Sequence, residues 1–361
     1  MPTLTTPRRL LASPVVDLLL GPHGVDRYLE LIRPVLTVRD PRAEIVEVRR
    51  QTARSVTVRL RPNGAWQGFA AGQFVRFGVE IDGVRHTRTY SPASSAHAAG
   101  ELEFTITVHP QGLVSRHLHS RARPGDVVYL SAAQGEFGLP DPRPERLVLV
   151  SGGSGITPVL SMLRTLIDED HSGHVAFVHY ARTREDWLYR AELEALAARH
   201  DWLSVSYLAT REGDGHLSAA SLEPLLGPGG VAGAHAAVCG PPTLIDAVRE
   251  VWAAQGAAER VRAETFTPPR LGAGVAAGEG TLHFLHSGRS VPAQAGTLLE
   301  QAEAAGLTPA FGCRMGICHT CTCRKAAGTV RNLLTGELHD GEDEDIQLCI
   351  SAPAGDVALE L

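Results

Sequence analysis

The chain contains 361 residues, of which 43% are hydrophobic and 20% are charged, and its net charge at pH 7 is −6. This length is more than one hydrophobic core usually serves, so the chain is expected to form several domains. The negative charge argues against a nucleic-acid-binding protein, and no apolar run reaches the ~20 residues that cross a bilayer.

Residues 1–41 are predicted to form a helical extension. The stretch GVDRYLELIRP repeats apolar residues at helical spacing, and Pro34 ends the pattern. Two arginines precede an apolar stretch near the start, as in a signal peptide, but a proline and an aspartate interrupt that stretch and no small-residue cleavage site follows. We therefore expect a cytoplasmic protein. Two roles for the extension remain open: packing against the next domain, or peripheral contact with a membrane surface.

Residues 42–143 show the alternating pattern of half-buried β-strands. The stretches AEIVEVRRQT, SVTVRLRP, GQFVRFGVEI, LEFTITVHP and GDVVYLSAA are separated by turns that contain Gly or Pro. Several short strands in about 100 residues predict a small antiparallel β-barrel.

Residues 144–268 alternate between strands and helices. RLVLVSGGSG is a buried strand that enters a glycine turn, and TPVLSMLRTLIDE is helical. Further strands follow at HVAFVHYA, LSVSYLAT and HAAVCGPP, with helices after the first and the last. This order predicts an α/β domain with a parallel sheet. A Gly-, Ala- and Pro-rich linker is predicted at 269–280, and residues 281–361 read as a hairpin, a helix, a cysteine loop and a final strand, which indicates a small α+β domain.

The most specific pattern is the group of cysteines near the end of the sequence. Cys313, Cys318 and Cys321 follow the spacing C-x4-C-x2-C, and Cys349 follows after 27 further residues. This is the spacing of [2Fe–2S] sites in which four thiolates hold the cluster. Structural zinc sites usually show two C-x2–4-C pairs, and Cys349 has no partner nearby. A disulfide framework would spread its cysteines through a small secreted domain, so we favour the iron–sulfur site.

The remaining residues of this region have simpler interpretations. The stretch FGCRMGICHTCTC…LC resembles the cluster loop of plant-type ferredoxins, and the resemblance implies their β-grasp fold for residues 281–361. All four cysteines are present, so His319 is expected to be a surface residue. Cys323 is expected to point away from the cluster as a structural thiol, and Cys239 lies in another domain.

Two motifs in the predicted barrel point to a flavin. RTYS, residues 88–91, ends one strand, and HPQGLVSRHL follows; together they resemble the R-x-Y-S and G-x-x-S elements of the ferredoxin–NADP reductase family. The resemblance implies that Arg88 holds a phosphate, Tyr90 walls the flavin ring and Ser91 bonds near its reactive edge. Plain barrel packing is the alternative for Tyr90 and Ser91. The implied flavin-site residues are Arg88, Tyr90, Ser91, His109, Gly112, Leu113, Val114 and Ser115.

Two motifs of the α/β domain point to a pyridine nucleotide. SGGSGITPVL resembles the GGxGxTP loop of the same family, and VCGPPTLIDAV resembles its CGPP motif. Glycines let the backbone approach a pyrophosphate, and a helix N-terminus stabilises its charge. Thr157 is implied to lie near the nicotinamide and flavin, and Cys239 beside the nicotinamide, unless Cys239 is only a buried structural residue. The implied nucleotide-site residues are Gly152, Gly153, Gly155, Thr157, Arg182, Cys239, Gly240 and Pro241.

The identity of both organic cofactors rests on weaker signals. HYARTREDWLYR presents Arg182 and Arg184 before any acid, which favours NADPH over NADH because Arg accommodates a 2′-phosphate, although both side chains could simply face solvent. The G-x-x-S run indicates room for a pyrophosphate, and Phe266 stands where FAD-binding members often have an aromatic residue. FAD is therefore favoured over FMN.

Over residues 42–361 the chain resembles flavoprotein reductases with a fused C-terminal ferredoxin domain. The resemblance implies hydride transfer from NADPH to the flavin, single-electron transfer to the [2Fe–2S] cluster and reduction of an external partner, with no catalytic side chain. It favours a membrane fatty-acid desaturase or a di-iron hydroxylase as the acceptor. A Rieske oxygenase or a cytochrome P450 is the alternative, and a redox-sensing binding protein is the non-enzymatic one.

The ferredoxin-like region carries most of the negative charge. Residues 281–361 contain ten acids and five bases, and GELHDGEDED, just before Cys349, holds six of the acids. The acidic stretch is either a solvated loop or a docking face for a basic partner protein.

Overall fold

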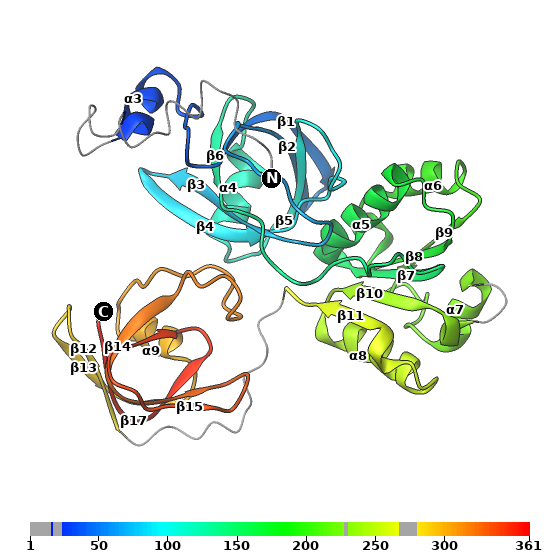
Figure 1. Cartoon of the computed structure of the whole chain (residues 1–361). Helices are drawn as coiled ribbons and strands as arrows, with labels where there is room; N and C mark the ends of the chain where they lie inside the picture. Colours follow the sequence, from blue (N-terminus) through cyan, green and yellow to red (C-terminus); the bar gives the residue numbers. More distant parts are fainter. Residues whose placement is uncertain (1–15, 17–23, 227–229, 267–279) are drawn as a thin grey trace. The chain divides into compact units, whose positions relative to one another are not determined.

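The computed structural model describes residues 16, 24–226, 230–266 and 280–361. The chain divides into two compact units, Met1–Phe266 and Thr267–Leu361. The first unit contains an antiparallel sheet and a parallel sheet, and the second contains a mixed sheet (Figure 1). The predicted multidomain fold class is confirmed: an antiparallel β-barrel, an α/β domain and a small α+β domain.

The antiparallel sheet forms the barrel, with the strand order β4-β3-β6-β1-β2-β5. Its inward side chains make one core in which Val58, Phe77 and Phe104 are fully buried, and helix α4 adds Val114 and Leu118 to that core. The elements are β1 (Arg42–Thr52), β2 (Ser55–Pro62), β3 (Val75–Ile81), β4 (Val84–Tyr90), β5 (Leu102–Thr107), α4 (Leu113–Arg121) and β6 (Val127–Leu130).

A short helix, α3 (Gly24–Ile32), precedes the barrel. The Asp26 carboxylate accepts the backbone N–H groups of Val38 and Arg39 at 2.5 and 3.1 Å. Arg42, the first residue of β1, donates to the Pro34 carbonyl at 2.6 Å and pairs with Glu30 at 2.5 Å. These bonds tie residues 26–39 to the first barrel strand. The rest of the predicted extension, apart from residue 16, lies outside the described residues.

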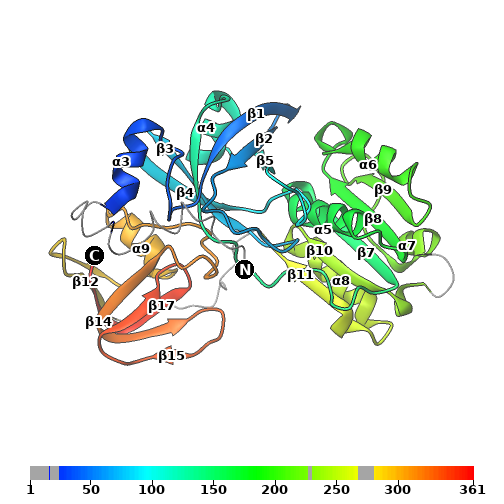
Figure 2. The same ribbon diagram turned by 45° about the horizontal axis from the view of Figure 1, so that its top comes forward.

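The parallel sheet has the strand order β11-β10-β7-β8-β9. Successive residues of β7 serve two cores: Leu147 and Leu149 pack with helices α5 and α6, whereas Val148 and Val150 pack with α7 and α8. Figure 2 shows these helix pairs on opposite faces of the sheet, and a sheet covered on both faces explains the continuous apolar strands. The strands are β7 (Arg146–Gly152), β8 (His174–Ala181), β9 (Leu203–Ala209), β10 (His235–Cys239) and β11 (Val261–Glu264).

Helices and short 3-10 turns connect these strands. The turns are η2 (Gly153–Gly155), η3 (Arg184–Asp186), η4 (Val231–Gly233) and η5 (Ala258–Arg260), and the helices are α5 (Ile156–Asp168), α6 (Arg190–Ala197), α7 (Ala219–Leu226) and α8 (Pro242–Ala253). The sequence pattern did not predict α7. Its helical signal is weak because Pro224 lies inside it, a residue that normally interrupts a helix.

The second unit contains a sheet with the order β13-β12-β17-β14-β15, and β16 pairs with β14. The predicted hairpin is present as β12 and β13, and the predicted helix is α9, which begins with a capping box between Thr297 and Glu300. Residues 269–279 of the predicted linker lie outside the described residues. The elements are β12 (Thr281–Phe284), β13 (Arg289–Pro292), α9 (Leu298–Ala304), β14 (Thr322–Asn332), β15 (Leu338–His339), β16 (Glu344–Gln347) and β17 (Ser351–Leu359).

The long strand β14 was not predicted, and Lys325 is the reason. Alternation along β14 places this lysine at an inward position, where it is fully buried. Its ammonium group donates to the Gly328 carbonyl at 2.8 Å and to the Gly341 carbonyl, and lies 3.5 Å from a Glu344 oxygen. A charged residue at an inward position hides the strand pattern, and the two carbonyls together with the Glu344 carboxylate make that position tolerable.

Candidate functional site

The RTYS motif lies where β4 ends and the following loop begins. The ring of Tyr90 packs edge-on against Phe77 at 5.6 Å, and burial, opposed by the Arg88 charge, raises the pKa of its phenol above the ordinary value. Ser91 is 2% exposed, and its hydroxyl has no hydrogen-bond partner among the residues that the structure describes. A buried hydroxyl without a partner is unfavourable, and a polar edge of a flavin ring would satisfy it. These residues therefore fit a flavin.

The second flavin motif forms a tight turn before α4. The Ser115 hydroxyl accepts the His109 N–H at 3.1 Å and donates to the Gly112 carbonyl at 3.2 Å. A Cβ at Gly112 would lie 2.5 Å from the Ser115 oxygen and 3.0 Å from Cβ of His109, so a larger residue would force this turn to shift. Within the described residues, no side chain forms a capping hydrogen bond at the start of α4. The Gly112 N–H already donates to the His109 carbonyl at 2.9 Å. The backbone N–H groups of residues 113 to 115 can therefore donate to a phosphate, while the buried side chain of Val114 and the exposed one of Leu113 contribute no polar group.

The two nucleotide motifs meet at the carboxyl ends of β7 and β10, which are neighbours in the sheet. A Cβ at Gly155 would lie 2.3 Å from the Cys239 carbonyl oxygen, and one at Gly152 would lie 2.7 Å from Cδ of Pro241. Thr157 is 3% exposed, and its hydroxyl donates to the Ser154 carbonyl at 3.3 Å. The GGSG and CGPP loops thus form one surface. It lies at the carboxyl ends of the parallel strands, where nucleotides bind in such sheets.

Glu264 belongs to this surface, and the sequence analysis missed it. The parallel register between β10 and β11 sets Glu264 opposite Cys239. Burial raises the pKa of the Glu264 carboxyl to about 8, and Oε2 of that carboxyl has no partner in the described part of the chain. Burial, followed by the Glu264 charge, also raises the pKa of the Cys239 thiol. The available signal was an acid at the end of the last parallel strand.

Glu264 gives a prediction about the pH dependence of stability. The carboxyl keeps its proton up to a pKa of about 8 when folded but loses it near the ordinary 4.5 when unfolded, so rising pH favours the unfolded state in this window. We expect the free energy of unfolding to fall by up to about 4 kcal/mol from this group between about pH 5 and about pH 9. A glutamine side chain does not ionise. In Glu264→Gln the free energy of unfolding should therefore not show this fall as the pH rises. Urea denaturation of both proteins across this range measures the difference, and equal pH slopes would contradict the assignment.

The arginines after β8 differ in their surroundings. Arg184 is engaged by two acids, Glu212 at 3.0 Å and Asp214 at 2.7 Å. Arg182 is exposed, and its carbonyl accepts the backbone N–H of Arg211 at 2.9 Å, which brings a second exposed arginine beside it. Arg211, in the turn two residues after β9, is a residue that the sequence pattern did not indicate. Two adjacent exposed arginines at this edge suit a 2′-phosphate.

The structure brings together the four cysteines of the predicted cluster. The Cys313 N–H donates to the Cys318 sulfur at 3.2 Å. Interaction with Cys318 and Cys349 lowers the pKa of Cys313, interaction with Cys313 raises the pKa values of Cys318 and Cys349, and interaction with Cys349 lowers the pKa of Cys321, so the four thiols lie close to one another. The lowered pKa values of Cys313 and Cys321 favour their thiolates, the form of cysteine that binds iron.

The loop around these cysteines is shaped for sulfur ligands. Backbone N–H groups of Met315 and Gly316 point at the sulfurs of Cys313 and Cys349, each at 3.3 Å. A Cβ at Gly312 would lie 2.7 Å from the Cys318 sulfur. Backbone donors and glycine at the closest approach fit a [2Fe–2S] cluster, whose sulfurs accept such hydrogen bonds.

Cys323 and His319 lie apart from this group, as the sequence predicted. The Cys323 sulfur faces backbone carbonyls, Arg324 at 3.5 Å and Glu360 at 3.9 Å. His319 is exposed, with a left-handed backbone (φ 54°) where the loop turns. Burial raises the pKa of the Cys323 thiol to about 11, so it stays protonated. Neither residue is therefore assigned as a cluster ligand.

Comparisons with known proteins match three family models in chain order. Residues 44–138 match the oxidoreductase FAD-binding domain, 149–250 the oxidoreductase NAD-binding domain, and 283–354 the 2Fe-2S iron-sulfur cluster binding domain. These matches support FAD, a pyridine nucleotide and a [2Fe–2S] cluster as the cofactors. Among the described residues, no helix is long and apolar enough to span a membrane.

Relatives and solved structures agree with this organisation. An NADPH oxidoreductase of Mycobacterium tuberculosis is 38% identical over 93% of this chain and 88% of its own length. The glycine betaine monooxygenase reductase subunit of Pseudomonas aeruginosa is 32% identical over 81% and 87%. The structure of phthalate dioxygenase reductase shares the fold, with a TM-score of 0.60 and 23% identity over 89% of this chain and 97% of the other.

Proposed function

Because the chain belongs to the ferredoxin–NADP reductase-like flavoproteins with a fused C-terminal [2Fe–2S] domain, we propose that it delivers electrons from NADPH to an oxygenase. It is an NAD(P)H-dependent oxidoreductase. The cofactors supply the conversion of a two-electron hydride donor into single-electron transfer. The observation that carries the proposal is the group of thiols that receives backbone N–H groups at the sulfurs of Cys313, Cys318 and Cys349, in a chain that also has the joined GGSG and CGPP loops.

The chain's own residues bind and orient. We assign flavin binding to residues 42–143, with Arg88 holding a phosphate, Tyr90 packing on the ring and the Ser91 hydroxyl bonding its polar edge. Nucleotide binding is assigned to residues 144–268, where Thr157 and Cys239 lie beside the nicotinamide. The cluster is assigned to residues 281–361, with Cys313, Cys318, Cys321 and Cys349 as its ligands.

An oxygenase is the acceptor that the comparisons support. The relatives include reductase subunits of glycine betaine monooxygenase and a reductase component of propane 2-monooxygenase. A membrane desaturase or a di-iron hydroxylase, which the sequence resemblance favoured, finds no such support. A Rieske oxygenase or cytochrome P450 system, first considered as the alternative, therefore becomes the main proposal.

The nucleotide preference can be tested with Arg182. If Arg182 holds the 2′-phosphate, Arg182→Ala should raise KM for NADPH by about 10-fold or more and leave KM for NADH within about twofold, because a charge-assisted hydrogen bond is lost. Separate titrations with NADPH and NADH, followed by flavin and cluster absorbance, measure both preference and function. Arg184→Ala is the matched control, since two acids already engage that side chain. A parent protein that prefers NADH would contradict the NADPH assignment.

The acidic stretch is proposed as the docking face. β16 carries Glu344 and Asp345 and pairs with the start of β14, where these acids lie opposite Lys325 and Arg324, three to four residues after Cys321. Asp343 and Asp345 remain 72% and 66% exposed, although both lie within 4 Å of Arg324. The rate of cytochrome c reduction should depend on ionic strength, and less so after Asp343→Asn and Asp345→Asn. A rate indifferent to salt would count against docking here.

A further inference from the structure

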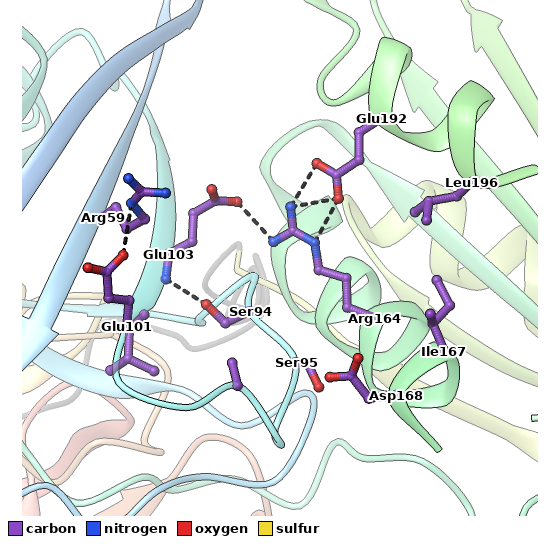
Figure 3. A pocket seen from close by; sticks show the side chains of 12 residues that line it. Arg59, Ser94, Ser95, Glu101, Glu103, Arg164, Ile167, Asp168, Glu192 and Leu196 are labelled. Atoms are coloured by element: carbon purple, nitrogen blue, oxygen red, sulfur yellow. Dashed lines mark hydrogen bonds and ion pairs between the residues drawn. The ribbon is translucent and has the colours of Figure 1, made fainter. Parts of the chain in front are cut away.

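A polar network joins the barrel to the helices of the parallel sheet inside the first unit. Arg164 of α5 lies between Glu192 of α6 and Glu103 of β5 (Figure 3). Its guanidinium donates Nε and Nη2 to the two Glu192 oxygens, both at 2.8 Å, and Nη1 to Glu103 at 2.9 Å. Both side chains of the Arg164–Glu103 pair are less than one-fifth exposed. The network borders a cavity of about 360 Å³.

Tyr189 completes the network from the start of α6. It is 4% exposed and adopts φ 57°, a left-handed conformation that bulky residues rarely adopt. Its hydroxyl donates to Glu103 at 2.9 Å and also contacts the Thr105 hydroxyl, both on β5 of the barrel. The unusual backbone thus directs a side chain of the nucleotide-binding part onto the barrel. Glu103 and Thr105 belong to the barrel, and Arg164, Tyr189 and Glu192 belong to the α/β part, so we name these five residues the interlobe latch.

The latch also connects the two predicted cofactor loops through one helix. The fourth bond of Arg164 goes from Nη1 to the Ala93 carbonyl at 2.8 Å, two residues beyond Ser91. The Ala93 N–H in turn donates to the Glu103 carbonyl at 2.7 Å. At the other end of α5 stands Thr157, next to the GGSG loop and roughly 10 Å from Arg164 along the helix axis. α5 therefore acts as a spacer between the Ser91 loop and the nucleotide loop.

We propose that the interlobe latch sets the distance between the flavin and the nicotinamide, with Arg164 and Tyr189 as positioning residues for hydride transfer. The inference rests on the proposed function, since it assumes that the barrel holds the flavin and the GGSG loop the nucleotide. Hydride transfer needs the two rings in contact at a fixed separation, and a misplacement of about 1 Å can cost 10²-fold in rate.

The chemistry of the network suits positioning better than simple stabilisation. A buried ion pair adds little net stability compared with apolar packing, but it holds its partners in one geometry. Arg164 uses all three guanidinium nitrogens, so rotation or sliding of α5 against the barrel would break several bonds together. Burial alone would lower the pKa of Arg164, but the Glu103 and Glu192 carboxylates raise it above the ordinary value.

The test compares Arg164→Met and Tyr189→Phe with Arg59→Met. Arg59 borders the same cavity, but within the described part of the chain it pairs only with Glu47 and Glu101 of the barrel region, so its loss removes a cation without breaking a bond between the barrel and the helices. In rapid-mixing experiments with saturating NADPH, the limiting rate of flavin reduction should fall about 10-fold or more for Arg164→Met and about threefold for Tyr189→Phe. The half-saturating NADPH concentration should change less than about threefold. Arg59→Met should match the parent protein.

A second readout does not depend on turnover. Hydrogen exchange in the protein without added nucleotide should increase at residues 91–101 and along α5 in both latch variants, and not in Arg59→Met. Reduction by dithionite should be unchanged in all variants, which shows that the flavin and cluster are intact. If Arg164→Met does not retain FAD, then Tyr189→Phe and Glu103→Gln decide the question.

The positioning role and the proposed function would be overturned by different results. Limiting rates within about twofold of the parent in the latch variants, or an equal loss in Arg59→Met, would overturn the positioning role. A parent protein whose flavin is reduced by neither NADPH nor NADH would instead overturn the proposed function.

Discussion

Replacing Cys318 by serine is expected to remove nearly all iron from the protein and to abolish electron transfer to cytochrome c. Cys318 is 1% exposed and its sulfur accepts the Cys313 backbone N–H at 3.2 Å, and it is one of the four proposed cluster ligands. Serine keeps the size of the side chain but lacks the soft thiolate that iron–sulfur clusters require. Flavin reduction by NADPH should continue, because the proposed flavin and nucleotide residues all belong to the first unit. Iron analysis, visible absorbance and parallel assays with ferricyanide and cytochrome c measure the result.

Cys323→Ser is the matched control. It removes a thiol that is also buried and lies in the same cysteine-rich stretch, but whose sulfur faces the carbonyls of Arg324 and Glu360. This variant should keep its iron and its cytochrome c activity. Loss of iron in Cys323→Ser with retention in Cys318→Ser would reverse the ligand assignment, and iron retained in both would remove Cys318 from the site.

Gly155→Ala is expected to lower the rate of NADPH-driven flavin reduction by about 100-fold. Gly155 has φ −64°, which any residue can adopt, so the requirement for glycine is one of space. The added Cβ would lie 2.3 Å from the Cys239 carbonyl oxygen and 3.0 Å from the Gly240 nitrogen, so the two nucleotide loops must separate. A displacement of about 1 Å at this surface is enough for an effect of that size. Rapid mixing with NADPH measures the rate, and dithionite should still reduce the flavin.

Gly233→Ala controls for the loss of a glycine as such. Gly233 belongs to the same α/β region, and an added Cβ would come no closer than 3.5 Å to Arg146, an ordinary contact. This variant should reduce its flavin at the parent rate. A Gly155→Ala protein that keeps the parent rate would show that the loop contact does not position the nucleotide.

Features that depend on contiguous residues could be predicted from the sequence. The spacing of Cys313, Cys318 and Cys321 lies within one loop, and the GGSG and CGPP motifs each lie at the end of one strand. The change from alternating strands to strand–helix pairs likewise predicted the barrel and the parallel sheet, because side-chain periodicity reports which face of an element is buried. In such cases the residues that form the feature are neighbours in the sequence, so the local pattern is enough to predict it.

Features that arise between elements could not be predicted in this way. Glu264 becomes part of the nucleotide surface only through the register of β10 and β11, and Arg211 reaches Arg182 only across β9 and β8. Lys325 contradicts the pattern of its strand, because its partners are carbonyls that come near only after folding. In each case the sequence shows a charged residue but not the neighbour that gives it a role.

The sequence by itself determined the kinds of cofactor and their order along the chain, because each binding motif is short and local. Only the tertiary structure decided how the motifs are held together: Gly155 against Cys239, Glu264 beside it, and Arg164 between Glu103 and Glu192. The physical reason is that packing distance and electrostatic pairing depend on which elements become neighbours, and sheet order and helix placement set those neighbours independently of any single motif.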